Sequence, residues 1–192
     1  MRLPYWVYYQ LARFRLMLRQ HEQAASAYRL ALTANPRFAL AAASLGFLHA
    51  SRGHHAEAAA AFQEALHINP GDADVWFDLG FVQQQLQQFE PALDSFQRAV
   101  ELRPSLDRAW FGMGMIYSAR LNHEKAVEMF KKAVALQPMN PHAYYELAMA
   151  QYALNNLDQV RKIIKQVSEF DPKVTRQLIR ETGQSPEGVA RG

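Results

Sequence analysis

Histidine is the residue type in this sequence best suited to chemistry near neutral pH, and five of the seven histidines lie in the first seventy residues. His49, His54 and His55 are close to Glu57 along the chain. Imidazole and carboxylate groups are common zinc ligands, so this cluster is the strongest metal candidate. Adjacent side chains in a turn do not converge on one ion, however. We therefore predict no metal site.

No other arrangement in the sequence is typical of catalysis or cofactor binding. His21, His55 and His123 occupy the same place in a repeating pattern, just before an amphipathic stretch, which predicts a structural role in a turn. The sequence has no Gly-rich phosphate loop, no Ser, His and Asp in a catalytic order, and no zinc-binding helix motif. It has no cysteine, which excludes disulfides and thiolate metal ligands. We therefore predict a protein that is not an enzyme and that has no cofactor.

The feature that organises the chain is a unit of 34 residues written five times. A fixed period of this length, without insertion or deletion, predicts a stacked-repeat solenoid. Its step is marked by Pro36, Pro70, Pro104, Pro138 and Pro172. The clearest copy covers 73–106, and its recurring residues are Trp76, Leu79, Gly80, Ala92, Phe96, Ala99 and Pro104.

Each copy contains two helical patterns, joined by a turn too short for anything except an antiparallel pair. A small residue such as Gly80 is expected where the second helix crosses the first, and a bulky one such as Phe96 fills the space between neighbouring copies. Asp72, Asp107 and Asn140 are placed to cap the helices that follow them.

The pattern of tryptophan, Leu-Gly, a small residue in the second helix, an aromatic four residues on, alanine three later and proline five beyond resembles the tetratricopeptide repeat. The resemblance implies an all-α, right-handed α-α superhelix of five helix-turn-helix repeats. We place these copies, numbered one to five, at 5–38, 39–72, 73–106, 107–140 and 141–174, with a capping helix at about 173–182. Residues 1–182 are then one solenoid, and 183–192 a flexible tail.

Tetratricopeptide repeats are interaction modules, so the resemblance implies that the first helices line a concave groove for a peptide or an amphipathic helix. The family builds this groove from the second, fifth, ninth and twelfth residues of each copy. Carried onto this sequence and extended along the same face, the pattern selects a stripe rich in aromatic rings and methionine: Trp6, Tyr9, Arg13, Phe47, Asp74, Phe77, Asp78, Phe81, Gln84, Arg108, Phe111, Met115, Tyr145, Met149 and Tyr152. The alternative is that these side chains pack on one another between adjacent first helices.

Asp74 and Asp78 lie one helical turn apart on this face, and together they would repel a ligand carboxylate. The sequence therefore argues against the carboxylate-binding role by which some family members hold chaperones. It favours a ligand with a basic group near the two aspartates, with Arg108 and Glu146 setting its register. The alternative is a solvated aspartate pair without a binding role.

Charge changes sign along the chain, although the formal net charge is only +3. Residues 1–38 carry +5, residues 57–107 carry −7 and residues 108–180 carry +5. The small net charge argues against a nucleic-acid partner. We therefore predict a non-enzymatic adaptor that binds a protein or peptide. The alternatives are a self-assembling scaffold whose groove binds the basic end of another copy, and the targeting module of a larger enzyme or secretion assembly.

The first twenty residues are apolar, aromatic and basic, as a targeting segment or a membrane-surface helix would be. Arg13, Arg15 and Arg19 interrupt them at helical intervals, and the repeat frame runs through them, so we interpret them as the first helix of copy one. No apolar run approaches the roughly 20 residues of a membrane span. We predict a cytoplasmic protein, and leave peripheral membrane association or a periplasmic location open. A composition rich in Ala, Arg and Gln favours a bacterial source.

Overall fold

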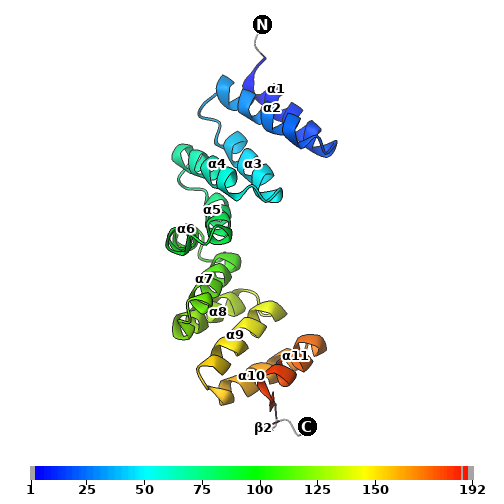
Figure 1. The fold of residues 1–192 in the computed structure, drawn as a ribbon, viewed down its shortest axis with the longest axis vertical. Helices are drawn as coiled ribbons and strands as arrows, with labels where there is room; N and C mark the ends of the chain where they lie inside the picture. Colours follow the sequence, from blue (N-terminus) through cyan, green and yellow to red (C-terminus); the bar gives the residue numbers. More distant parts are fainter. Residues whose placement is uncertain (1–2, 187, 190–192) are drawn as a thin grey trace. The chain divides into compact units, whose positions relative to one another are not determined.

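A computed structural model describes residues 3–186 and 188–189, and it divides into two compact units, residues 1–103 and residues 104–192. Each unit is described by itself. Unit 1 holds copies one to three as three helix pairs (Figure 1). Its helices are α1 (Tyr5–Met17), α2 (His21–Ala34), α3 (Ala39–Ser51), α4 (His55–Ile68), α5 (Ala73–Gln85) and α6 (Phe89–Leu102).

Unit 2 holds copies four and five and a terminal helix. Its elements are α7 (Asp107–Ala119), α8 (His123–Leu136), α9 (Pro141–Ala153), α10 (Leu157–Ser168), α11 (Pro172–Thr182), β1 (Gln184–Ser185) and β2 (Gly188–Val189). Helix α11 packs on α9 and α10, which places it at the end of unit 2 as a cap. No helix among residues 3–186 is long and apolar enough to cross a membrane.

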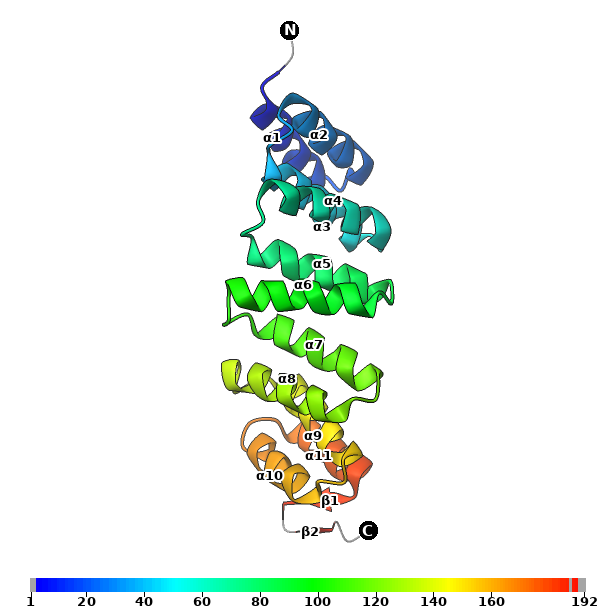
Figure 2. The ribbon, with the colours of Figure 1, turned by 90° about the vertical axis from the view of Figure 1, so that its left-hand side faces the viewer.

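Helices pack in a regular order inside each unit (Figure 2). Each first helix packs on the second helix of its own copy, as α1 does on α2 and α3 on α4. Inside a unit, the second helix also packs on the first helix of the next copy: α2 does so on α3, α4 on α5 and α8 on α9. One helix pair cannot bury both of its faces, so most of the core lies between successive helices of the series.

In the three middle copies a glycine of the first helix lies against an aromatic ring of the second, and the sequence predicts this small residue at the helix crossing. A Cβ atom added to Gly80 would lie 2.7 Å from the ring of Phe96, which is shorter than real Cβ contacts. Gly46 and Phe62 have the same relation at 2.7 Å, and so do Gly114 and Phe130 at 2.5 Å. The rings of all three phenylalanines are almost fully buried. In copy five the matching buried pair is Ala148 and Ile164.

The turn between the two helices of a copy places one residue in the left-handed backbone region. Positive φ values of 57–76° occur at five positions that are 34 residues apart: Arg19, Gly53, Gln87, Leu121 and Asn155. This conformation suits glycine because a Cβ atom crowds the following carbonyl. Only copy two has glycine there. In the other copies a residue with a Cβ atom adopts this conformation, which costs conformational energy. Leu121 is the least suited, since it is also 77% exposed and gains little from burial.

Helix starts agree with the sequence except at Asp107. Asp72 accepts hydrogen bonds from the amides of Asp74 and Val75, and Asn140 caps α9 in the same way. The prediction that Asp107 caps α7 is wrong: Asp107 is the first helical residue, and the cap position belongs to Leu106, which has no capping side chain. The repeat step of 34 from Asp72 leads to residue 106, so the aspartate is one position late to act as a cap.

The end of unit 2 departs from the repeat. Pro172 is the first residue of α11, after Asp171, whose side chain accepts bonds from the amides of Lys173 and Val174. The other four repeat prolines lie in turns between helices. The predicted tail also begins with packed residues: Gln184 is buried and accepts a hydrogen bond of 2.7 Å from Arg161, and β1 pairs with β2. Residues 187 and 190–192 of that tail lie outside the described residues.

We expect Gly80→Ala to lower the free energy of unfolding by about 1–3 kcal/mol, because the new methyl group overlaps the Phe96 ring. Adding Phe96→Ile should recover part of this loss, since copy five uses the pair Ala148 and Ile164 at the same crossing. Urea unfolding followed by circular dichroism measures both variants. A Gly80→Ala protein as stable as the parent would show that the crossing is not close-packed.

We expect Leu121→Gly to raise the free energy of unfolding by about 0.5–1 kcal/mol, because glycine adopts φ of 59° without the Cβ penalty. Thermal unfolding would show the gain as a higher Tm. Leu30→Gly, at an exposed leucine inside α2, is the matched control and should lower Tm. A lower Tm for both variants would contradict a strained turn at Leu121.

Candidate functional site

The predicted stripe separates into packed rings and exposed rings. In copies one, three and four the aromatic side chain at the fifth position lies against the ring of its own second helix. Tyr9 lies 5.6 Å from Tyr28 and Phe77 lies 5.7 Å from Phe96, measured between ring centroids. In unit 2, Phe111 lies 5.5 Å from Phe130. These rings are half-buried, and they form the rim of the core rather than a free surface.

Side chains at the ninth position of copies two and three are exposed instead. Phe47 is 62% exposed and Phe81 is 45% exposed, and Trp6 at the start of α1 is 55% exposed. A ring left in water at this level is a candidate for burial against a ligand. In copies two and three the ninth position therefore carries an exposed apolar ring.

A pocket of about 290 Å³ lies between α3 and α5 of unit 1, and the exposed rings of Phe47 and Phe81 line it. Phe62 and Phe77 contribute to its wall, and Asp78 is its one charged lining residue. Phe62 lies one repeat before Phe96, so the sequence pattern by itself places it in the core. The remaining lining residues are Ala50, Ser51 and Val82. The pocket is thus an apolar slot with one carboxylate in its lining.

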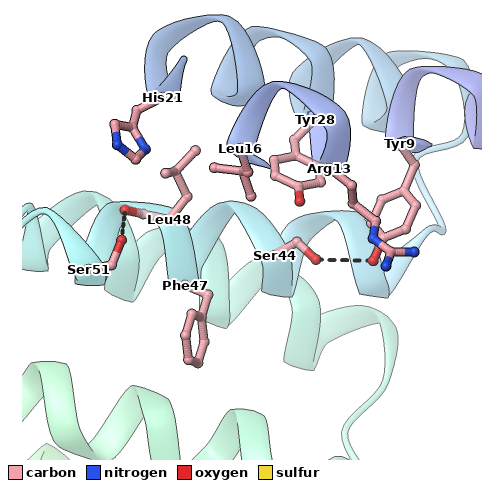
Figure 3. A pocket seen from close by; sticks show the side chains of 9 residues that line it. All are labelled: Tyr9, Arg13, Leu16, His21, Tyr28, Ser44, Phe47, Leu48 and Ser51. Atoms are coloured by element: carbon pink, nitrogen blue, oxygen red, sulfur yellow. Dashed lines mark hydrogen bonds between the residues drawn. The ribbon is translucent and has the colours of Figure 1, made fainter. Parts of the chain in front are cut away.

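A second pocket, of about 380 Å³, lies between α1 and α3 (Figure 3). Its polar lining comes from Tyr9, Arg13, Ser44, His21 and Ser51. The hydroxyl groups of Tyr9 and Ser44 are 3.5 Å apart. Phe47 also lines this pocket, and Figure 3 shows its ring projecting from α3 away from α1. Phe47 is thus shared by a polar pocket and an apolar pocket.

The two aspartates predicted to meet a basic ligand differ in their surroundings. Asp74 forms an ion pair with Arg103, with 2.5 Å between its carboxylate oxygen and Nη2 of the arginine. This pair already supplies Asp74 with a cation from its own chain. Asp78 lines the apolar pocket beside Phe81. Of the two carboxylates, Asp78 is the one that lines this pocket.

In unit 2, the terminal helix α11 engages part of the predicted stripe. The hydroxyl group of Tyr145 donates a hydrogen bond of 2.6 Å to Glu181 of α11, and this bond lowers the pKa of Glu181. Burial raises the pKa of Glu146, which was expected to set ligand register. The other predicted residues here are half-buried or exposed: Arg108, Met115, Met149 and Tyr152.

The histidines have structural positions and do not form a metal site. His21, His55 and His123 are each the first residue of a second helix rather than turn residues before it. Their Nδ1 atoms are buried, as is that of His49, and none has a hydrogen-bond partner among the described residues. Burial lowers the pKa of His49, so it stays neutral near pH 7. Across residues 3–186, no three His, Asp or Glu side chains are grouped to bind a metal ion.

Family models described as tetratricopeptide repeat match residues 9–73, 45–110 and 119–178. The chain is a tetratricopeptide-repeat protein. Solved structures of this family have the same all-α fold. MamA has 20% sequence identity and a TM-score of 0.82, and the match covers 92% of this chain and 94% of MamA. YrrB has 23% sequence identity and a TM-score of 0.77, and the match covers 90% of each chain. PilF of Pseudomonas aeruginosa has 21% sequence identity and a TM-score of 0.75, and the match covers 92% of this chain and 83% of PilF. A comparison with curated protein sequences gives no significant match.

These likenesses establish the fold of this tetratricopeptide-repeat protein, a right-handed α-α superhelix. The family to which the chain belongs consists of protein-interaction scaffolds that are generally not enzymes. The YrrB structure is described as having an unusual peptide-binding site.

We expect the two phenylalanines of α5 to behave differently when truncated. Phe77→Ala removes a ring packed on Phe96 and should lower the free energy of unfolding by about 2–3 kcal/mol. Phe81→Ala removes an exposed ring and should change it by less than about 0.5 kcal/mol. Urea unfolding of the two variants makes the comparison. Equal losses would show that Phe81 is part of the core.

Proposed function

We propose that the face of unit 1 formed by α1, α3 and α5 binds a peptide segment of a partner protein. One large apolar side chain of the peptide enters the pocket between α3 and α5. The observation that carries this proposal is an apolar pocket with two exposed rings, Phe47 and Phe81, at its edge. Covering such rings contributes about 2.5 kcal/mol for each ~100 Å² buried, before the cost of ordering the peptide.

The charged groups beside the pocket define the rest of the ligand. Asp78 favours a basic residue next to the apolar side chain. On the other side of Phe47, Arg13 and Ser44 favour a carbonyl or carboxylate oxygen. Helices that line one face lie about 10 Å apart, and an extended peptide rises about 3.3 Å per residue. The acceptor group and the apolar side chain are therefore about three residues apart in the peptide.

The size of the pocket supports a peptide side chain rather than a small-molecule substrate. Its volume of about 290 Å³ is at the lower end of ligand pockets, which suits one or two side chains. Peptide binding also agrees with the description of the YrrB structure. Cytoplasmic location, a bacterial source and the absence of a nucleic-acid partner stay predictions from the sequence.

A phage-displayed library of random twelve-residue peptides, selected on the full chain, tests the proposal. Selected peptides should share a large apolar residue next to Lys or Arg. Isothermal titration should show at least a tenfold weaker Kd for Phe81→Ala. It should show a smaller, salt-dependent loss for Asp78→Asn.

Leu136→Ala, at an exposed leucine on a second helix of unit 2, is the matched control and should bind as the parent does. Peptides that bind the parent and Phe81→Ala equally would place the binding site elsewhere. Selection of no peptide at all would overturn peptide binding as the function of this face.

A further inference from the structure

Helix α3 buries an imidazole whose Nδ1 atom is not hydrogen-bonded. His49 is 8% exposed, and its Nδ1 atom has no partner among the described residues. Its ring lies beside that of His54, in the turn between α3 and α4, with 6.0 Å between the ring centroids. The backbone fixes this arrangement, because the amide of His54 donates a hydrogen bond of 2.9 Å to the carbonyl of His49. Two imidazoles are thus held side by side inside unit 1.

The repeat shows that other copies place a hydrogen bond here. In copy one the matching pair is Arg15 and Gln20, joined by a side-chain hydrogen bond of 3.1 Å. In copy five it is Gln151 and Asn156, joined by one of 2.9 Å. Copy two has two titratable rings at the same place, and the buried Nδ1 atom of His49 is left unbonded. The pair in copy two is therefore suited to respond to pH, because imidazole changes its charge between about pH 5 and 8.

The charged groups around His49 oppose a proton on its ring. Arg29 faces it from α2, and Glu57 faces it from α4. Arg52 and His54 face it from the turn between α3 and α4. Burial lowers the pKa of His49, and the two arginines lower it further, whereas Glu57 acts in the opposite sense. A proton on His49 would therefore place a positive charge in a buried site that cations already surround.

The segment of α3 around His49 also forms both pockets of unit 1. Phe47 and Ser51 line both of them. Leu48 lines the pocket between α1 and α3, and Ala50 lines the pocket between α3 and α5. A change in how α3 packs on α2 and α4 would therefore alter both pockets at once.

We propose that His49 is a pH switch of unit 1. Neutral His49 lets α3 pack closely on α2 and α4, and protonated His49 loosens α3 and weakens peptide binding in the pockets beside it. The effect on peptide binding rests on the proposed function, whereas the loosening of α3 does not.

The direction of the switch follows from the difference between the folded and unfolded chains. Because the pKa of His49 is lowered in the folded chain, the unfolded chain takes up this proton first, at about pH 6.5. The contribution of His49 to stability is therefore fully present above about pH 6.5 and is lost as the pH falls below it. The nearby ion pair of Arg52 and Glu22 does not respond in this range, since its hydrogen bond lowers the pKa of Glu22.

His49→Gln removes the titrating group and introduces a side chain that the repeat already uses at this position. Gln83 in copy three and Gln151 in copy five are both buried there. Adding His54→Asn gives a second variant, which rebuilds the hydrogen-bonded pair of copy five. His67→Gln, at an exposed histidine of α4, is the matched control.

Hydrogen exchange of the full chain at pH 7.5 and pH 5.5 gives protection factors for the amides of α3, with the intrinsic effect of pH on exchange removed. Between these two pH values, protection in the parent and in His67→Gln should fall about threefold or more further than in His49→Gln. The double variant with His54→Asn should behave as His49→Gln does. Isothermal titration with the selected peptides should show a weaker Kd at pH 5.5 for the parent, and a smaller change for His49→Gln.

An equal loss of protection in the parent and in both His49 variants would overturn the switch. So would a pH response that His67→Gln abolishes as well. Loosening of α3 without any difference in peptide Kd between the parent and His49→Gln would overturn the effect on binding. Selection of no peptide would overturn the proposed function, and the exchange experiment would still decide whether His49 controls the packing of α3.

Discussion

The contact between a glycine of each first helix and an aromatic ring of the second is the constraint on which the middle copies depend. At Gly46, Gly80 and Gly114 a Cβ atom would come within 2.5–2.7 Å of the ring. The backbone of the first helix therefore contacts the aromatic side chain of the second helix directly. Because packed interiors deform little, this contact fixes the rotation of the first helix about its own axis. That rotation decides which side chains of the helix reach the core and which face water.

Exposure along the face formed by the first helices follows from the same constraint. Once Gly80 rests on Phe96, the ring of Phe77, three residues earlier, is brought onto Phe96 as well. Phe81, one residue after the glycine, is turned toward solvent. A groove residue of the family pattern can therefore be part of the core or part of a binding surface. Its distance from the crossing glycine determines which.

The two units differ in what lies along their first helices. Unit 1 has two pockets between its first helices, and Phe47 lines both of them. In unit 2, α11 packs on α9 and α10, and its Glu181 accepts the hydrogen bond of Tyr145. The C-terminal helix thus acts as a cap, whereas the matching face of α1 has none among the described residues.

Much of this protein follows from its sequence because a strict period encodes the same local physics five times. The step of 34 residues, the helix pairs, the crossing glycines and the caps at Asp72 and Asn140 are all visible in the order of residue types. The strained turn at Leu121 is not, because leucine gives no sign of a left-handed conformation. Nor does the sequence distinguish Phe77 from Phe81, or show that Asp74 is paired with Arg103. Those differences arise only when helices from separate parts of the chain pack together, because burial and ion pairing depend on neighbours that the order of residues along one helix does not name.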